Sequence, residues 1–387
     1  MRRHFFWLYL TVFVNIIGFG MIFPILPLFA EKYQASSLQI GFIAATFSLG
    51  QFLFSPFFGR LSDRFGRKPI ILSSMVISGV SYLMLFEADS LPLIFLARFL
   101  SGVSSAANFP VASSYIADIT TRENRTKYMG KVSGVFSLGF VVGPVFGGLL
   151  GNGGFSSAFL AAAILSFANL LLAFFFLPES ISQKAEKFVL KEGLLNVKAI
   201  YNGMRGDFSL LFLLLSLWAF YISNFQVAIP LFAQDKFNFG ALQNGFFFSL
   251  TGIVAAITQW FLLPYIVKRV GEIKTIFAGI LFMAIGQILA PLSANVMVFY
   301  LFFVISIFGS GLNRPSINAL LSKGTREGQG TTMGLAFSFE SIGRFVGPLA
   351  AGAVMGSLGL AFPFWITAAL LLIGLFFFWK IEMKKRR

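Results

Sequence analysis

Long apolar runs separated by short polar breaks dominate this chain and predict its secondary structure. Twelve runs approach or exceed the roughly 20 residues that a helix needs to cross a bilayer. Because the runs lack strict apolar–polar alternation, and because backbone groups in lipid must be satisfied within the segment unless a barrel closes, we predict helices. The runs occupy residues 5–30, 38–58, 69–86, 91–118, 127–150, 156–177, 208–233, 242–266, 273–291, 295–321, 328–356 and 359–380.

The runs fall into two groups of six, separated by one long polar break at residues 178–207. We therefore predict an all-α membrane protein with two pseudo-symmetric six-helix bundles, residues 1–180 and 208–387. Residues 181–207 would form a cytoplasmic linker. Lys and Glu alternate there among apolar residues, which is typical of an amphipathic stretch at the membrane interface, and a solvated linker is an equal alternative.

The two halves also repeat each other. Residues 122–130 (RENRTKYMG) and 326–334 (REGQGTTMG) share Arg, Glu, Met and Gly at an offset of 204. At the same offset a Gly-Gly-Pro-Gly set at 139, 143, 144 and 148 recurs as Gly343, Gly347, Pro348 and Gly352. Duplicated halves are how many transporters build a central site between two lobes.

The composition agrees with a protein solvated by lipid. Apolar residues make up 57% of the chain and charged residues 12%, which is more apolar surface than a soluble protein hides. The sequence has no Cys, and its single His, His4, lies beside the N-terminus. These counts exclude disulfides, thiol chemistry and a His-based metal site, and no nucleotide-binding loop occurs. We predict no enzymatic activity, no cofactor and no metal.

The Lys and Arg residues that give the net charge of +15 are distributed unevenly between the two predicted sides of the membrane. With the N-terminus inside, 24 of the 30 Lys and Arg fall on the cytoplasmic side, and the outer loops hold only Lys32 and Lys236. This bias predicts a multi-pass protein of the cell membrane with both termini in the cytoplasm. The basic face would meet anionic headgroups rather than nucleic acid. We expect a monomer.

The polar break at residues 59–68, GRLSDRFGRK, holds the densest group of charges between two spans. Gly59 would let its helix approach another backbone closely, and Gly66 would permit a tight turn. Asp63 can pair with Arg64 or Arg67, or face a helix N-terminus. Such contacts, with Lys68 beside them, predict a gate at the membrane surface. The alternative is a basic loop that only fixes topology.

A second motif consists of small residues spaced along the fifth span. Small residues about four apart form a flat strip that allows close helix packing, and a proline inside a helix removes a hydrogen bond and bends it. Ordinary tight packing without a role in transport is the alternative. The motif comprises Gly130, Gly139, Gly143, Pro144, Gly147 and Gly148.

Four charged residues lie at least seven residues from either end of their spans, where charge is costly and usually functional. Arg98 lies seven residues into the fourth span, and we expect Asn15 and Gln51 to hydrogen-bond it; snorkelling to the interface is the alternative. Glu340 and Arg344 share a helix face. They form either a structural pair or a switch in which Glu340 takes up a proton when Arg344 moves away. Arg314 would compete for Glu340.

These motifs resemble a known family. The loop 59–68 is similar, residue for residue, to the signature loop of the major facilitator superfamily, and the Gly130–Gly148 spacing resembles the antiporter motif of its drug–proton exchangers. Residues 18–27 (GFGMIFPILP) and 116–120 (IADIT) resemble the twelve-helix branch that includes bacterial tetracycline and quinolone efflux pumps. In those pumps an Arg at the position of Arg98 is implicated in proton transfer.

The resemblance implies a secondary transporter that exports hydrophobic or amphiphilic compounds in exchange for protons. It would work by rocking of two lobes about a midplane cavity. Two alternatives are a transporter of one defined metabolite or lipid, and a membrane sensor or scaffold that has lost transport. The partners would be a small-molecule substrate, protons and the bilayer.

Two departures from the family concern the group that couples transport to protons. Tetracycline-type exporters carry an Asp near the position of Asn15, and quinolone-type pumps carry a Glu where this chain has Gln226. Neither amide can take up a proton. Glu340 has taken over the coupling, or Asp118 or Asp63 serves from nearer the surface, or coupling is weak or different. The polar groups expected near the cavity are Asn15, Gln51, Asn224, Gln226 and Gln259.

Overall fold

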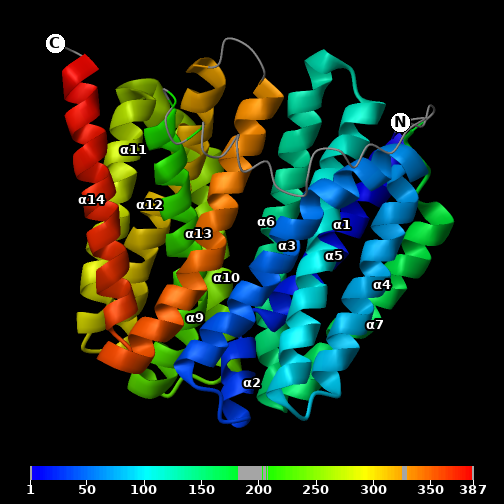
Figure 1. The fold of residues 1–387 in the computed structure, drawn as a ribbon, viewed down its shortest axis with the longest axis horizontal. Coiled ribbons are helices and arrows are strands. Elements are labelled where there is room, and N and C mark those ends of the chain that lie inside the picture. The colour runs from blue at the N-terminus through cyan, green and yellow to red at the C-terminus, as the bar shows by residue number, and fades with distance from the viewer. Residues whose placement is uncertain (1, 182–202, 204–205, 207, 325–328, 386–387) are drawn as a thin grey trace. The chain divides into compact units, whose positions relative to one another are not determined.

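A computed structural model describes residues 2–181, 203, 206, 208–324 and 329–385, and all regular structure within them is helical (Figure 1). The elements of the first half are α1 (Arg2–Ile22), α2 (Leu26–Lys32), α3 (Ser37–Phe65), α4 (Arg67–Phe86), α5 (Leu91–Ile119), α6 (Arg122–Asn152) and α7 (Phe155–Phe176). Those of the second half are α9 (Ser209–Phe237), α10 (Ala241–Ile257), the π-helix η1 (Thr258–Leu262), α11 (Leu263–Leu289), the 3-10 helix η2 (Ala290–Leu292), α12 (Val296–Gly324), α13 (Gln329–Leu358) and α14 (Phe362–Lys385).

The predicted fold of twelve membrane-crossing helices is confirmed. Ten stretches of the described chain are long and apolar enough to span a membrane, and one of them, the 52 residues Ala241–Leu292, contains two predicted spans. The remaining predicted span is α13, which carries Glu340 and Arg344. The first predicted span is broken after Ile22 and resumes as α2, close to Pro24, which has no N–H to donate. The predicted linker 181–207 lies almost wholly outside the described residues.

The loop predicted at residues 59–68 is shorter than expected. Helix α3 continues to Phe65, and α4 begins at Arg67, so that Gly66 alone separates them. Its φ of 112° lies in the left-handed region that favours glycine, as the predicted tight turn requires. Gly271, with φ 80°, makes the corresponding break inside α11, and the π-helix η1 lies upstream of it.

The described residues divide into two compact units. Unit 1 takes residues from 1–35, 46–196 and 239–249, and unit 2 takes residues from 36–45, 197–238 and 250–387. The start of α10 therefore belongs to the unit built mainly from the first half, and the start of α3 belongs to the other unit.

In unit 1, glycines bring α6 into backbone contact with α1. A Cβ added to Gly143 would lie 2.8 Å from the Ile17 carbonyl oxygen and 2.9 Å from the Gly20 Cα. Gly147 approaches the α1 backbone more closely still, at the Met21 carbonyl oxygen, and an added Cβ on Gly139 would lie 2.9 Å from the Ile16 side chain. We call these three residues the α6 glycine seam. Gly148 instead faces α10, where an added Cβ would lie 3.0 Å from the Gly245 Cα. The close packing predicted for the motif is wrong at Gly130, where an added Cβ would meet open space.

Unit 2 repeats this arrangement. Gly343 and Gly347 of α13 meet the backbone of α9, and a Cβ on Gly347 would lie 2.7 Å from the Phe220 carbonyl oxygen. Gly352 faces the start of α3, where an added Cβ would lie 3.1 Å from the Gly41 Cα. Gly41 and Gly245, the partners of Gly352 and Gly148, are themselves 204 residues apart. The two halves therefore repeat both these glycines and the glycines that they contact.

We predict that Gly143→Ala destabilises the protein by about 1–3 kcal/mol, because the added methyl group overpacks the contact of α6 with α1. Gly130→Ala, with open space, should be neutral or stabilise by up to about 1 kcal/mol through helix propensity. Thermal unfolding of the purified protein measures both. Gly347→Ala and Gly334→Ala form the same pair in unit 2. Equal effects at Gly143 and Gly130 would show that the seam is not tightly packed.

Candidate functional site

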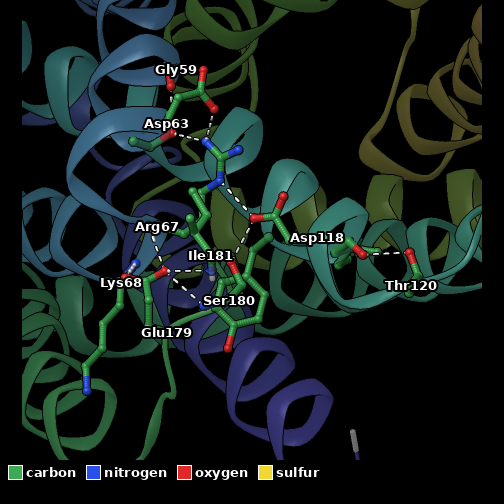
Figure 2. A network of polar contacts seen from close by, with 12 residues as sticks. Gly59, Asp63, Arg67, Lys68, Asp118, Thr120, Glu179, Ser180 and Ile181 are labelled. Atoms are coloured by element: carbon green, nitrogen blue, oxygen red, sulfur yellow. Dashed lines mark hydrogen bonds and ion pairs between the residues drawn. The ribbon is translucent and has the colours of Figure 1, made fainter. Parts of the chain in front are cut away.

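A polar network surrounds Arg67 at the junction of α3 and α4 (Figure 2). The Arg67 side chain is 9% exposed, and its Nη1 lies 2.6 Å from the Asp63 Oδ1. Its Nε donates to the Asp118 Oδ2 at 3.0 Å, and Nη1 also donates to the Ser62 hydroxyl. Of the pairings predicted for Asp63, the structure contains the one with Arg67. That guanidinium links the end of α3 to α5.

Glu179, which follows α7, caps the N-terminus of α4. Its Oε1 accepts from the Arg67 N–H at 2.9 Å, and its Oε2 accepts from the Lys68 N–H at 3.2 Å. These N–H groups have no partner within the helix, and a carboxylate also suits the positive end of the helix dipole. The sequence indicates Asp63 as a candidate for such a position and does not indicate Glu179, which occupies it. The available signal was an isolated carboxylate directly after the sixth apolar run.

The remaining predicted gate residues have different surroundings. The Lys68 Nζ donates to the Phe174 carbonyl oxygen at 2.7 Å, and the Arg64 guanidinium lies 5.4 Å from the Phe65 ring centroid. The Ser180 hydroxyl adds a bond of 2.8 Å to Asp118. The predicted close backbone approach at Gly59 is wrong in this structure, because an added Cβ would have no neighbour within 4 Å.

Among the described residues, Arg98 of unit 1 has no carboxylate partner, and its Nε has no hydrogen-bond partner. The side chain is buried, with the residue 6% exposed, and its guanidinium lies 4.6 Å from the Phe47 ring centroid. The expected bonds from Asn15 and Gln51 are wrong. Asn15 accepts from Asn108 at 3.2 Å, and Gln51 donates to the Ser105 hydroxyl at 3.1 Å. Those partners lie on α5, as Arg98 does, but farther along the helix.

Unit 2 contains a three-residue ionic cluster, in which Glu340 binds two arginines. Arg314 donates from Nε to the Glu340 Oε1 at 2.8 Å and from Nη2 to Oε2 at 3.1 Å. Arg344 donates from Nη2 to the same Oε2 at 2.9 Å. The carboxylate side chain is 3% exposed, whereas those of Arg314 and Arg344 are 39% and 27% exposed. Arg314 therefore shares Glu340 with Arg344 rather than displacing it.

Aromatic rings flank the two arginines of this cluster. The Arg314 guanidinium lies 5.2 Å from the Trp218 ring, whose Nε1 donates to the Ser310 hydroxyl at 2.9 Å. The Arg344 guanidinium lies 5.9 Å from the Phe337 ring. Cation–π contacts of this kind stabilise guanidinium groups that are partly removed from water.

The amides predicted near a cavity have different surroundings within their own units. Asn224 is 2% exposed at the contact of α9 with α13, where its Nδ2 donates to the Gly347 carbonyl oxygen at 3.5 Å and its Oδ1 has no partner among the described residues. Gln226 is partly exposed on α9, and Gln259 is exposed on η1. Their role in binding stays a prediction. Within the described residues, no group of three or more His, Asp or Glu is placed to hold a metal ion.

Comparison with known proteins identifies relatives over nearly the whole chain. The family model described as Major Facilitator Superfamily matches residues 8–348 and 260–387. Multidrug resistance protein 2 of Bacillus subtilis is 30% identical over 94% of this chain and 92% of its own length. The class C tetracycline resistance protein of Escherichia coli is 31% identical over 89% and 87%. Quinolone resistance protein NorA of Staphylococcus aureus is 26% identical over 92% and 90%.

Solved structures share the fold. The human organic anion transporter MFSD10 matches with a TM-score of 0.73 and 24% identity, over 97% of this chain and 99% of that one. A bacterial homologue of the human lysosomal transporter Spinster, in an inward-facing and occupied conformation, matches with a TM-score of 0.81 and 16% identity over 98% and 96%. At these identities the likeness concerns the arrangement of helices.

We predict that Glu179→Ala destabilises the protein by about 1–2 kcal/mol, because the first N–H groups of α4 lose their acceptor. Amide hydrogen exchange at Arg67 and Lys68 should accelerate with it. Glu87→Ala, at the opposite end of α4, is the matched control and should be neutral, because a carboxylate near the negative end of the dipole contributes no stability. Unchanged exchange at Arg67 would contradict the capping role.

We predict that Arg98→Met stabilises the fold by about 1–3 kcal/mol and abolishes transport, because an unpaired charge is removed from an apolar interior. The melting temperature of the purified protein and substrate efflux are measured on the same preparation. Lys131→Met removes an exposed cation, which lies 5.3 Å from the Tyr128 ring, and should leave the melting temperature nearly unchanged. A lower melting temperature for Arg98→Met would mean that Arg98 supports the structure.

Proposed function

This chain belongs to the Major Facilitator Superfamily, and we propose that it exports hydrophobic or amphiphilic compounds by proton antiport with alternating access. It is a multi-pass membrane protein of a transporter family. Relatives named for multidrug, tetracycline and quinolone resistance, aligned over about nine-tenths of the chain, support the direction of transport. The bias of Lys and Arg supports cytoplasmic termini.

The observation that carries the proton-coupling part of this proposal is the burial of Glu340 between two arginines. Among the described acidic residues, Glu340 is the one that is buried. Taking up a proton would cancel the negative charge that holds Arg314 and Arg344, and both ion pairs would weaken together. Because the two arginines come from α12 and α13, protonation of one carboxylate would loosen a contact between two helices.

Asp63 and Asp118 are the other candidates for coupling. Both carboxylates bind Arg67, and Asp63 is 53% exposed while Asp118 is 23% exposed. The Asp63 carboxylate is the more exposed of the two, and an ion pair with an exposed partner contributes little energy, so the contact of Asp63 with Arg67 costs little to break. We propose that the Arg67 network is the gate of the transporter, made and broken during the cycle, and that Glu340 is the coupling group.

Everted membrane vesicles test the function directly. Respiration acidifies their lumen, and addition of tetracycline, norfloxacin or ethidium should dissipate the pH gradient, as reported by acridine orange fluorescence. We predict that Glu340→Gln lowers this proton release at least tenfold, because the amide cannot be protonated, whereas Glu87→Gln behaves like the parent.

Two outcomes would change the proposal. Full coupling by Glu340→Gln, together with its loss in Asp118→Asn, would move the coupling group to the Arg67 network. If no compound dissipates the gradient in parent vesicles, and none is protective in a pump-deficient host, the assignment as a drug exporter is wrong.

A further inference from the structure

We propose that the compound carried by this protein bears an anionic group, which binds the free N–H groups of Arg314 and Arg344. The inference names the substrate class of the proposed transport function and rests on it. It follows from the balance of charge in the ionic cluster, the unused donors of the two arginines and the aromatic rings beside them.

The first argument is the balance of charge. The cluster holds two guanidinium groups and one carboxylate, which leaves one positive charge in excess. The excess charge lies on the side chains of Arg314 and Arg344, which are only partly enclosed. Because charge within a membrane-spanning segment is costly, this excess favours a counter-charge supplied from outside the chain.

The second argument is the number of donors that remain. A guanidinium carries five N–H groups in a fork that fits carboxylate, sulfonate or phosphate oxygens. Within the part of the chain that the structure describes, Arg314 donates to Glu340 from Nε and Nη2, and Arg344 donates from Nη2. The donors that remain are Nη1 of Arg314 and Nε and Nη1 of Arg344. Both arginine side chains are partly exposed while Glu340 is enclosed. A ligand that reaches the cluster would meet donors and positive charge before it met the carboxylate.

The third argument concerns the apolar part of such a ligand. The Trp218 ring lies beside Arg314 and is fixed by its bond to Ser310, and the Phe337 ring lies beside Arg344. Rigid aromatic faces next to charged donors suit an amphiphile that has an aromatic body and an anionic head. A cationic ligand would face two arginines, and the single carboxylate near them is already shared.

Three naphthalene probes of matched shape test the proposal on the full-length protein in detergent at fixed ionic strength. They are naphthalene-2-sulfonate, (2-naphthylmethyl)trimethylammonium and 2-naphthylmethanol, with charges of −1, +1 and 0. Isothermal titration or ligand-dependent melting gives their affinities. We expect the sulfonate to bind at least tenfold more tightly than the quaternary ammonium.

Variants of the cluster sharpen the test. Arg314→Gln and Arg344→Gln each leave Glu340 with one arginine, so the cluster becomes neutral without an orphaned carboxylate. Each should weaken sulfonate binding at least tenfold and leave the neutral probe unaffected. Glu340→Gln raises the net charge and should strengthen sulfonate binding severalfold. The control is Arg269→Gln, which removes an exposed cation stacked on Tyr265 and should change nothing.

The outcomes separate this inference from the transport function. Equal binding of the sulfonate and the quaternary ammonium by the parent protein overturns the anion site even if a variant fails to fold. Sulfonate affinity that is unchanged in both arginine variants overturns it too. Sulfonate binding without any proton release in vesicles supports the anion site and contradicts the proposed transport function. Proton-coupled efflux of ethidium without sulfonate binding supports the transport function and contradicts the anion site.

Discussion

Close contact between helix backbones is the constraint on which this structure depends. In lipid each helix satisfies its own hydrogen bonds, so helices attract one another mainly by packing, and packing is closest where side chains are smallest. The α6 glycine seam and its counterpart in α13 supply those places. Gly343 follows Glu340 by three residues and lies against α9, so the same contact sets the height and rotation of the buried carboxylate. The position of Glu340 in unit 2 therefore depends on glycines that let α13 pack closely against α9.

The ionic cluster shows how an apolar unit accommodates charge. One arginine would neutralise the buried Glu340 carboxylate. Because a second arginine binds the same carboxylate, a movement of either arginine changes the electrostatic surroundings of the other. Arg98 represents the opposite case, because it lies against the face of the Phe47 ring and its Nε has no hydrogen-bond partner among the described residues. Groups held in such unfavourable surroundings reduce stability, and their retention favours a role in binding or coupling.

The sequence predicted the helices well, because apolar runs in lipid leave the backbone few alternatives. It predicted their ends poorly near residues 59–65, where charged side chains suggested a loop although nothing before Gly66 breaks a helix. Hydrogen bonds between residues far apart in the sequence were harder still to predict. The bonds expected from Asn15 and Gln51 to Arg98 go to Asn108 and Ser105, because helix rotation, which apolar runs leave open, decides which polar groups meet. The capping by Glu179 depends on a similar meeting of distant segments.

The π-helix η1 accounts for a one-residue difference in spacing between the two copies of the repeat. Ala241, the first residue of α10, follows Ser37, the first residue of α3, by 204 residues, whereas the left-handed Gly271 follows Gly66 by 205. A π-turn accommodates one additional residue within an α-helix. The second copy thus absorbed an insertion between these two landmarks without losing either. Because the wider π-turn takes up the additional residue, the side chains beyond it keep the helix faces of their first-half counterparts instead of turning by about 100°.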